Sequence, residues 1–132
     1  MFDKNIRILI VEPNETQAIC VDKMLNRMGY YCVASTRTLI EGLILNSYGL
    51  RKFDALILPE HMIRPTPGKA SSGTIFNINN LFVYACDSSS TRIDPKNKGV
   101  LRTHTGLPEY PALEEFMTCV VRNHSLSLAK TA

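Results

Sequence analysis

Short apolar runs alternate with segments of helical periodicity along the first half of the chain. Residues 6–11 (Ile-Arg-Ile-Leu-Ile-Val) and 55–58 (Ala-Leu-Ile-Leu) are almost wholly apolar, which predicts strands buried on both faces of a parallel sheet. Residues 30–35 predict another strand between them. Pro59 ends the run at 55–58, because proline donates no backbone N–H to a neighbouring strand. The residues after Leu58 are therefore expected at the carboxyl end of the sheet, where open α/β folds carry their chemistry.

A first helix is predicted between residues 14 and 28. Asn14 followed by Gln17 is typical of a helix N-terminus, and Gly29 is expected to stop the helix in a left-handed conformation. Apolar side chains at helical spacing predict one buried face. That face is formed by Ala18, Val21, Met24, Leu25 and Met28.

A second helix is predicted after Thr38, which forms a capping box with Glu41, and it is expected to end at Gly49. Its apolar side is expected to consist of Leu39, Ile40, Leu43, Ile44 and Tyr48. The order strand–helix–strand–helix–strand with short links predicts a parallel sheet with right-handed crossovers.

The second half of the chain has a weaker pattern. Residues 64–80 and 87–98 are rich in proline, glycine or serine, so we expect neither segment to form a regular helix. Residues 81–86 predict a fourth strand and residues 100–104 a weaker fifth strand. This half of the chain should therefore complete the sheet with fewer helices than the first half.

A last helix is predicted from Pro111, which suits a first helical position. Its apolar face is formed by Leu113, Phe116, Met117, Val120 and Val121. Residues 125–132 are expected to form a frayed tail or a linker after a single domain of residues 1–124.

Composition fits an ordinary globular domain: the 132 residues are 45% hydrophobic and 20% charged. No apolar run approaches the roughly 20 residues of a membrane helix, and the start lacks a signal-peptide pattern, so a cytoplasmic location is expected. Scattered basic residues and a net charge of +3 do not suggest nucleic-acid binding. Neither the cysteines nor the histidines have metal-ligand spacing, so no metal or cofactor is expected, and the cysteines are interpreted as buried hydrophobes. These residues are Cys20, Cys32, Cys86, Cys119, His61, His104 and His124.

Three segments resemble the receiver domain of two-component response regulators. Residues 8–14 (Ile-Leu-Ile-Val-Glu-Pro-Asn) resemble its first strand and acidic pair, residues 28–33 its Leu-Gly-Tyr entry to the second strand, and residues 53–62 the strand that ends at the phosphoacceptor aspartate. Leu107-Pro108 falls where the family has Lys-Pro. The resemblance implies a flavodoxin-like three-layer α/β fold with a five-stranded parallel sheet of order 2-1-3-4-5, here with the third and fourth helices short or missing.

The resemblance also implies a phosphorylation site, and most of its groups are missing. Phosphoryl transfer needs a carboxylate nucleophile, oxygen ligands for Mg²⁺ and a cation on the phosphoryl group. The corresponding positions are Glu12, Pro13, Pro59, Ala85 or Cys86, and Leu107. Pro59 replaces the acceptor aspartate, Pro13 the second acid and Leu107 the lysine. The sequence therefore resembles a pseudo-receiver without catalytic activity, which implies a role as a protein interaction module.

The resemblance implies that the partner is a histidine kinase, receiver or output domain of the same pathway. One protein that could contain this domain is a hybrid histidine kinase. The expected interaction surface is a modest basic stretch near the last strands. In an active receiver an aromatic residue in the last strand takes part in the conformational switch, and segment 100–104 has no Phe, Tyr or Trp for this role. The basic stretch comprises Arg92, Lys96, Lys98 and Arg102. A plain solvated loop is the alternative interpretation of this stretch.

A second function stays open at the level of sequence. The alternative is a flavodoxin-like domain that binds a small ligand or cation at the same crevice. In this alternative Glu12, Glu60 and Asp87 gather there to hold a cation, or Glu60 or His61 accepts a phosphoryl group. Against a phosphate ligand, residues 12–16 contain no glycine and two glutamates. A DNA-binding regulator would need a further domain to bind DNA.

Overall fold

The computed structural model describes residues 5–49, 52–63, 78–93 and 99–131. The elements follow one another in the order β1 (Ile8–Val11), α1 (Glu15–Arg27), β2 (Val33–Thr36), α2 (Leu39–Tyr48), β3 (Ala55–Pro59), a short 3₁₀ helix η1 (Glu60–Met62), β4 (Asn80–Tyr84), β5 (Ser90–Ile93), β6 (Val100–Thr103) and α4 (Tyr110–Thr131). None of the described helices combines the length and the apolar character needed to cross a membrane.

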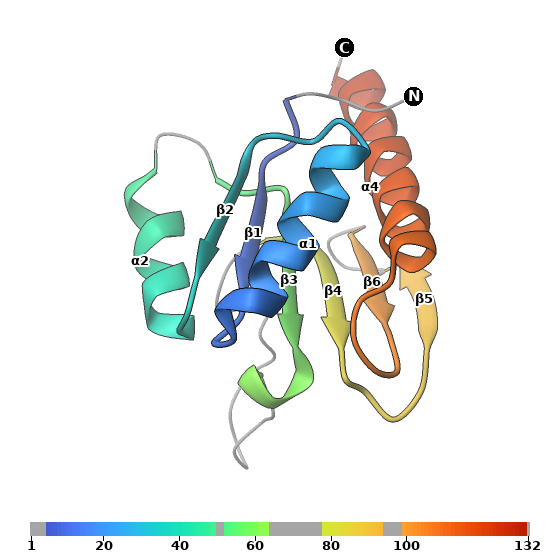
Figure 1. Ribbon diagram of the computed structural model, residues 1–132. Coiled ribbons are helices and arrows are strands. Elements are labelled where there is room, and N and C mark those ends of the chain that lie inside the picture. Colours follow the sequence, from blue (N-terminus) through green and yellow to red (C-terminus); the bar gives the residue numbers. More distant parts are fainter. Residues whose placement is uncertain (1–4, 50–51, 64–77, 94–98, 132) are drawn as a thin grey trace, which may run out of the picture.

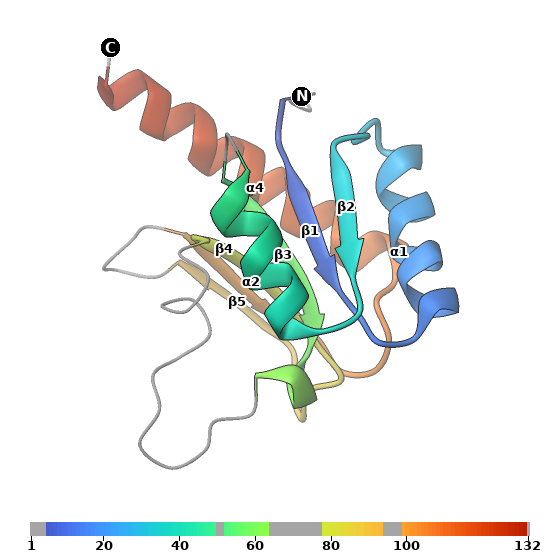
Figure 2. The same ribbon diagram turned by 90° about the vertical axis from the view of Figure 1, so that its left-hand side faces the viewer.

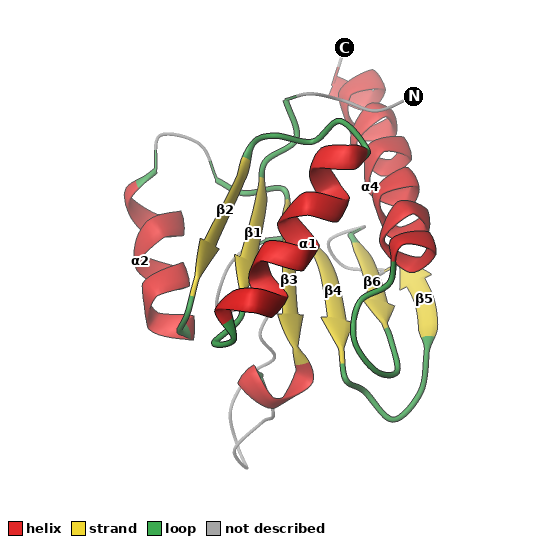
Figure 3. Cartoon of the chain, viewed as in Figure 1, coloured by secondary structure: helices red, strands yellow, loops and turns green. Residues whose placement is uncertain are grey.

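The strands form one six-stranded sheet in the order β2-β1-β3-β4-β6-β5 (Figure 1 and Figure 3). The first five strands in this order are parallel, and they are the five strands that the sequence predicts. This confirms the flavodoxin-like class. The count of five is wrong, because β5 adds an antiparallel edge strand next to β6, within the segment 87–98 that was expected to form no regular helix and for which no strand was predicted. The sequence of β5, Ser-Thr-Arg-Ile, is mostly polar and has no apolar run that would predict a strand.

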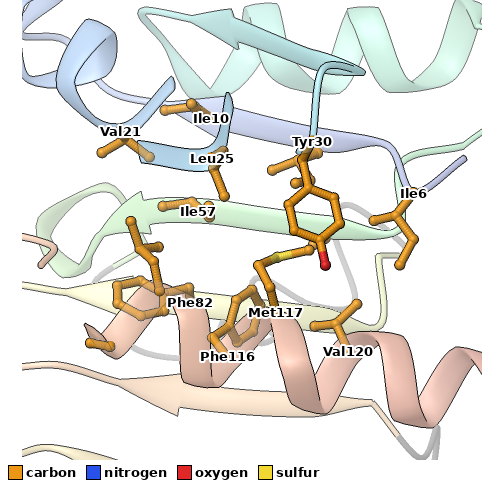
Figure 4. Packing of buried hydrophobic residues seen from close by; sticks show 14 of the residues in the cluster. Ile6, Ile10, Val21, Leu25, Tyr30, Ile57, Phe82, Phe116, Met117 and Val120 are labelled. Carbon is orange, nitrogen blue, oxygen red and sulfur yellow. The ribbon is translucent and has the colours of Figure 1, made fainter. Parts of the chain in front are cut away.

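Helices cover the two faces of the sheet unequally, with α1 and α4 on one face and α2 on the other (Figure 2). Side chains of β1, β3 and β4 alternate between the two layers, as the pleat of a strand requires. The larger core lies under α1 and α4, where Phe82 and Phe116 meet edge to face with ring centroids 5.4 Å apart (Figure 4). The predicted faces of α1 and of the last helix are confirmed in this core, with Met24, Met28 and Val121 only partly buried.

Local signals set the ends of the first helices as predicted. The side chain of Asn14 accepts a hydrogen bond from the Gln17 N–H at 3.0 Å. The Thr38 hydroxyl oxygen likewise accepts from the Glu41 N–H at 3.1 Å, and the same hydroxyl donates to the Glu41 carboxylate at 3.0 Å. Gly29 has φ of 100°, and the Tyr30 N–H donates to the Leu25 carbonyl oxygen at 3.0 Å. This is a Schellman ending, in which glycine avoids the steric cost of the left-handed conformation.

Two expectations for helices are wrong. On α2, Leu39 and Leu43 pack against the sheet, whereas Ile40, Ile44 and Tyr48 point away from it and are exposed. The apolar side of this helix is broader than the part that the sheet covers, so periodicity alone could not select the inner face. The last helix also continues to Thr131, so residues 125–131 are helical rather than a frayed tail.

Candidate functional site

The carboxyl ends of β1, β3 and β4 bring the candidate residues together. β3 lies between β1 and β4 in the sheet, and Pro59, its last residue, pairs in register with Tyr84 at the end of β4. Glu12 directly follows β1 and is only 6% exposed. Glu12, Pro59 and Tyr84 share the sheet face covered by α1 and α4, because alternate residues before them, such as Ile10, Ile57 and Phe82, lie in that core.

A side-chain hydrogen bond connects the ends of β1 and β4, which lie on either side of β3. The Tyr84 hydroxyl donates to Oε1 of Glu12 at 2.7 Å, and the Tyr84 side chain is almost fully buried. Because β3 separates β4 from β1, this contact crosses the sheet at Pro59, the position where the resemblance places a phosphoacceptor. The tyrosine therefore occupies the space beside the one carboxylate that remains of the acidic pair.

In this hydrogen bond the Tyr84 phenol is always the donor and the Glu12 carboxylate is the acceptor. Burial, followed by the hydrogen bond to Glu12 and the charge of its carboxylate, raises the pKa of Tyr84 well above its ordinary value. The phenol therefore stays protonated and donates throughout the physiological range. Oε2 of Glu12 accepts from the Asn14 N–H at 3.3 Å, so both carboxylate oxygens have partners within the protein.

The other degenerate positions offer no replacement for the missing groups. Pro13 is exposed, and Leu107 is 60% exposed at the position where the family has lysine. Ala85 has φ of 60°, a left-handed conformation that is rare for alanine, and its N–H donates to the Gly106 carbonyl oxygen. Cys86 binds the same loop through its N–H, which donates to the His104 carbonyl oxygen. The loops after β4 and β6 are thus held to each other by backbone contacts.

Glu60 and Asp87 lie close to the Cys86 thiol. Burial, a hydrogen bond with Glu60 and the charges of Glu60 and Asp87 raise the pKa of the Cys86 thiol, against a smaller opposing contribution from its backbone contact with His104. The thiol therefore stays protonated, and it lies 3.3 Å from the Val83 carbonyl oxygen. In the part of the chain that the structure describes, no three His, Cys, Asp or Glu side chains are placed to hold a metal ion together.

The two described histidines have different surroundings. His61 is exposed, whereas His104 is buried, with Nε2 3.1 Å from the Leu107 carbonyl oxygen and its ring centroid 5.7 Å from that of Phe82. The buried Nδ1 of His104 has no hydrogen-bond partner among the described residues. The imidazole is therefore an aromatic ring in the segment 100–104, where the sequence offers no Phe, Tyr or Trp. The side chain of His124 lies outside the described residues.

The expectation of four buried cysteines is wrong, because Cys20 and Cys32 are exposed and only Cys86 and Cys119 are partly buried. All four cysteines are free thiols. The two exposed thiols lie on α1 and just before β2, where short apolar contexts in the sequence do not imply burial.

The two described arginines of the basic stretch differ in exposure. Arg92 is exposed on β5, but the Arg102 side chain is only 14% exposed, with Nη1 3.0 Å from a Glu115 carboxylate oxygen on α4 and 2.8 Å from the Thr91 hydroxyl. Arg102 thus links β6 to α4 and β5. Lys96 and Lys98 lie outside the described residues.

Sequence reasoning missed Tyr84, the residue that defines this site. A signal was present, because Tyr84 and Glu12 each stand at the carboxyl end of a predicted parallel strand, and such ends meet at one edge of a sheet. The missing information was the register, which places Tyr84 rather than Ala85 or Cys86 opposite Pro59.

No protein-family model matches this chain, and no curated protein matches it in sequence. Solved structures do match it. The N-terminal domain of a response regulator/sensory box/GGDEF three-domain protein from Carboxydothermus hydrogenoformans has a TM-score of 0.62 at 16% identity, over 92% of this chain and 98% of that chain.

Two further structures support the same comparison. A response regulator from Burkholderia pseudomallei, determined with a phosphorylated aspartic acid, a calcium ion and citrate, has a TM-score of 0.56 at 18% identity, over 97% of this chain and 74% of that chain. A two-component response regulator from Legionella pneumophila has a TM-score of 0.54 at 16% identity, over 88% of this chain and 98% of that chain. With the sheet order and the two helical layers, these matches show that the chain has the flavodoxin-like fold of response regulators.

Proposed function

We propose that this chain is a non-phosphorylatable pseudo-receiver, which acts as a protein interaction and regulatory module in two-component signalling and has no catalytic activity of its own. The observation that carries the proposal is the Tyr84–Glu12 hydrogen bond, which crosses the sheet at Pro59. An active receiver needs an open carboxylate cluster at this place for Mg²⁺ and a nucleophile beside it. Here a protonated phenol holds the remaining carboxylate, and the nucleophile position has no reactive side chain.

The loss of the cation supports the same proposal. A lysine at position 107 would neutralise the charge that develops on the transferred phosphoryl group, and Leu107 supplies none. The fold shared with response regulators suggests the pathway, and it favours a histidine kinase, receiver or output domain as the partner. A hybrid histidine kinase or an atypical response regulator would then be the protein that contains this domain.

The direct test is treatment of the purified chain with acetyl phosphate and Mg²⁺, followed by intact-protein mass spectrometry. A phosphorylatable response regulator treated in parallel is the positive control. We expect the mass of this chain to stay unchanged, because nucleophile, metal ligands and cation are all altered. A gain of one phosphoryl group, mapped to the carboxyl end of the sheet, would overturn the proposal.

The variant Pro59→Asp sharpens this test by restoring only the nucleophile. We expect it to remain unlabelled, because Tyr84 still holds Glu12 and Leu107 still lacks a charge. Efficient labelling of this single variant would show that Glu12 and its neighbours still bind Mg²⁺, and that the site has lost only its acceptor.

A module without a phosphoryl trigger is expected to present one constant surface. A ligand shifts an equilibrium only through different affinities for its states, and here the phosphoryl group that supplies this difference in a receiver has no acceptor. We therefore expect ¹H–¹⁵N spectra recorded with and without Mg²⁺ and beryllofluoride to overlay. Shifts confined to residues around Glu12 and Cys86 would instead indicate a responsive site.

The side of the sheet formed by β5 and β6 is the proposed surface for the protein partner. All four residues of β5 are exposed, and within the described part of the chain β5 pairs with β6 alone, which makes its outer edge suitable for pairing with another chain. Arg92→Glu should weaken binding to the partner kinase or receiver domain, whereas the matched variant Lys23→Glu on the exposed side of α1 should not. Equal binding by both variants would place the partner surface elsewhere.

A further inference from the structure

Helix α2 carries an apolar surface that nothing in the described structure covers. Ile40, Ile44, Leu45 and Tyr48 are 69%, 51%, 40% and 85% exposed, and they make up four of the eight exposed large apolar side chains among the described residues. Ile40, Ile44 and Tyr48 follow one another at intervals of four residues, so they lie along one line of the helix. We call these four residues the outer α2 face.

The helix cannot turn to bury this face against its own sheet. Its inner side already contacts the sheet through Leu39 and Leu43, and the buried Oδ1 of Asn46 accepts a hydrogen bond from the Phe53 N–H at 3.2 Å. Figure 2 shows α2 alone among the helices on its side of the sheet. A helix that is apolar on both sides is normally buried on both sides, which points to a second molecule on the outer α2 face.

We propose that the outer α2 face binds the same face of a second copy of this chain, with the two helices antiparallel about a two-fold axis near Ile44. This arrangement sets Ile44 against Ile44 and sets Ile40 of each copy near Tyr48 of the other. An isologous contact of this kind needs a self-complementary surface, and a line of residues centred on Ile44 meets that requirement.

The polar groups on α2 select the antiparallel arrangement and suit a second copy. Glu41 supplies the one formal charge on α2, and Tyr48 supplies the phenol at its other end. Antiparallel packing brings the Tyr48 hydroxyl of one copy to the Glu41 carboxylate of the other, a charge-assisted hydrogen bond that forms twice. Parallel packing would instead set the two Glu41 carboxylates together, which is unfavourable.

The remaining charges near α2 do not oppose this contact. The Arg37 guanidinium, just before the helix, is paired with Glu15 at 2.9 Å, and the Glu41 carboxylate accepts from the Thr38 hydroxyl at 3.0 Å. No lysine or arginine lies within α2, and Lys52, the next described cation along the chain, comes four residues after Tyr48. A helix of 10 residues offers a small contact, so we expect a weak dimer with a dissociation constant of about 100 μM.

The test is sedimentation equilibrium of the purified full chain from about 10 μM to 1 mM, a range around the affinity expected of so small an interface. We expect the weight-average mass to rise from monomer towards dimer. Ile44→Glu should remove this rise and weaken association at least tenfold. The matched control is Ile19→Glu, an isoleucine on the exposed side of α1 that is 46% exposed, and it should associate as the parent chain does. Circular dichroism melting of both variants checks that each remains folded.

Two further variants test the geometry. Tyr48→Phe should weaken the dimer by a few fold because it removes only the donated hydrogen bond, and Tyr48→Glu should abolish it because two carboxylates then meet at each end. A parent chain that stays monomeric at 1 mM overturns the proposal and leaves the face for a different protein. Equal weakening by Ile19→Glu and Ile44→Glu would also overturn it. Neither result bears on phosphorylation, so the proposed function is tested separately.

Discussion

Helices α1 and α2 follow neighbouring strands of one sheet and begin at similar caps, but they use their apolar residues differently. Ala18, Val21 and Leu25 of α1 are buried, and most of its outer side is polar. The outer side of α2 is apolar and exposed at Ile40 and Ile44. The difference follows from the layers, because α1 shares its face of the sheet with the 22-residue α4, whereas α2 is the only described α-helix on the other face, where the short 3₁₀ helix η1 adds Met62.

This contrast shows that one domain can hold two kinds of apolar surface. The layer under α1 and α4 closes a core around Phe82, Phe116 and Tyr84, and the same layer holds the Tyr84–Glu12 hydrogen bond. On the other face of the sheet, only the inner side of α2 is buried, and its outer side is exposed. We therefore expect substitutions in the first layer to change folding stability, and substitutions on the outer α2 face to change association.

The largest effect is expected from Phe116→Ala, which removes a fully buried ring from the layer of α4. It should lower the free energy of unfolding by about 3–5 kcal/mol, because lost burial and a cavity add together. Ile44→Ala is the comparison on α2, and at low protein concentration it should change stability by less than about 0.5 kcal/mol. Urea unfolding of both variants measures the contrast, and similar losses would show that the two layers are equally packed.

Tyr84→Phe removes the hydroxyl at the degenerate site and leaves the ring in the core. It should cost about 1.5–3 kcal/mol, because Oε1 of Glu12 then stays buried without its charge-assisted donor. Urea unfolding near pH 7 measures this loss. A stability change below about 0.5 kcal/mol, within the range of ordinary surface substitutions, would show that water replaces the hydroxyl and that the carboxylate is more open than its contacts imply.

The same tyrosine predicts a dependence on alkaline pH. The folded-state pKa of Tyr84 is raised above its ordinary value of 10.0, so the unfolded chain loses this proton first. Its contribution to stability is therefore complete below about pH 10 and falls by about 1.4 kcal/mol per unit above it. Unfolding measured between pH 9 and 11 should show a steeper decline for the parent chain than for Tyr84→Phe. Parallel curves would contradict a buried, protonated phenol.

An intermediate effect is expected from Asn46→Ala, on the inner side of α2. The variant leaves the buried Phe53 N–H without its acceptor, which should cost about 1–3 kcal/mol. Thermal melting followed by circular dichroism measures it, with Ser47→Ala on the exposed side of the same helix as the control. An unchanged melting temperature for Asn46→Ala would mean that α2 is held by its leucines alone.

The smallest contrast concerns the two arginines of the basic stretch. Arg102→Ala should cost about 1–2 kcal/mol because Arg102 is mostly buried and links Glu115 to Thr91, whereas Arg92→Ala on the exposed edge strand should stay within about 0.5 kcal/mol. Chemical unfolding of the two variants side by side gives the comparison. Equal small effects would restore the interpretation of both arginines as solvated surface residues.

The sequence was sufficient where local chemistry decides the structure. The caps at Asn14 and Thr38, the left-handed Gly29 and the apolar runs of β1 and β3 act over a few residues, and all are found as predicted. The absence of side-chain chemistry at Pro59 and Leu107 is likewise a property of residue type. The sequence was insufficient for β5, because a short polar strand forms through its pairing with β6 rather than through its own pattern.

By itself, then, the sequence determined the fold class, the element boundaries set by caps and glycine, and the absence of a reactive or charged side chain at Pro59 and Leu107. Only the tertiary structure decided that Tyr84 holds Glu12 across Pro59, because that contact joins residues 72 positions apart and depends on strand register. Only the tertiary structure decided which side of α2 is buried. Helical periodicity gives the angle of each side chain around its helix, but burial depends on which other layers of the molecule cover that angle.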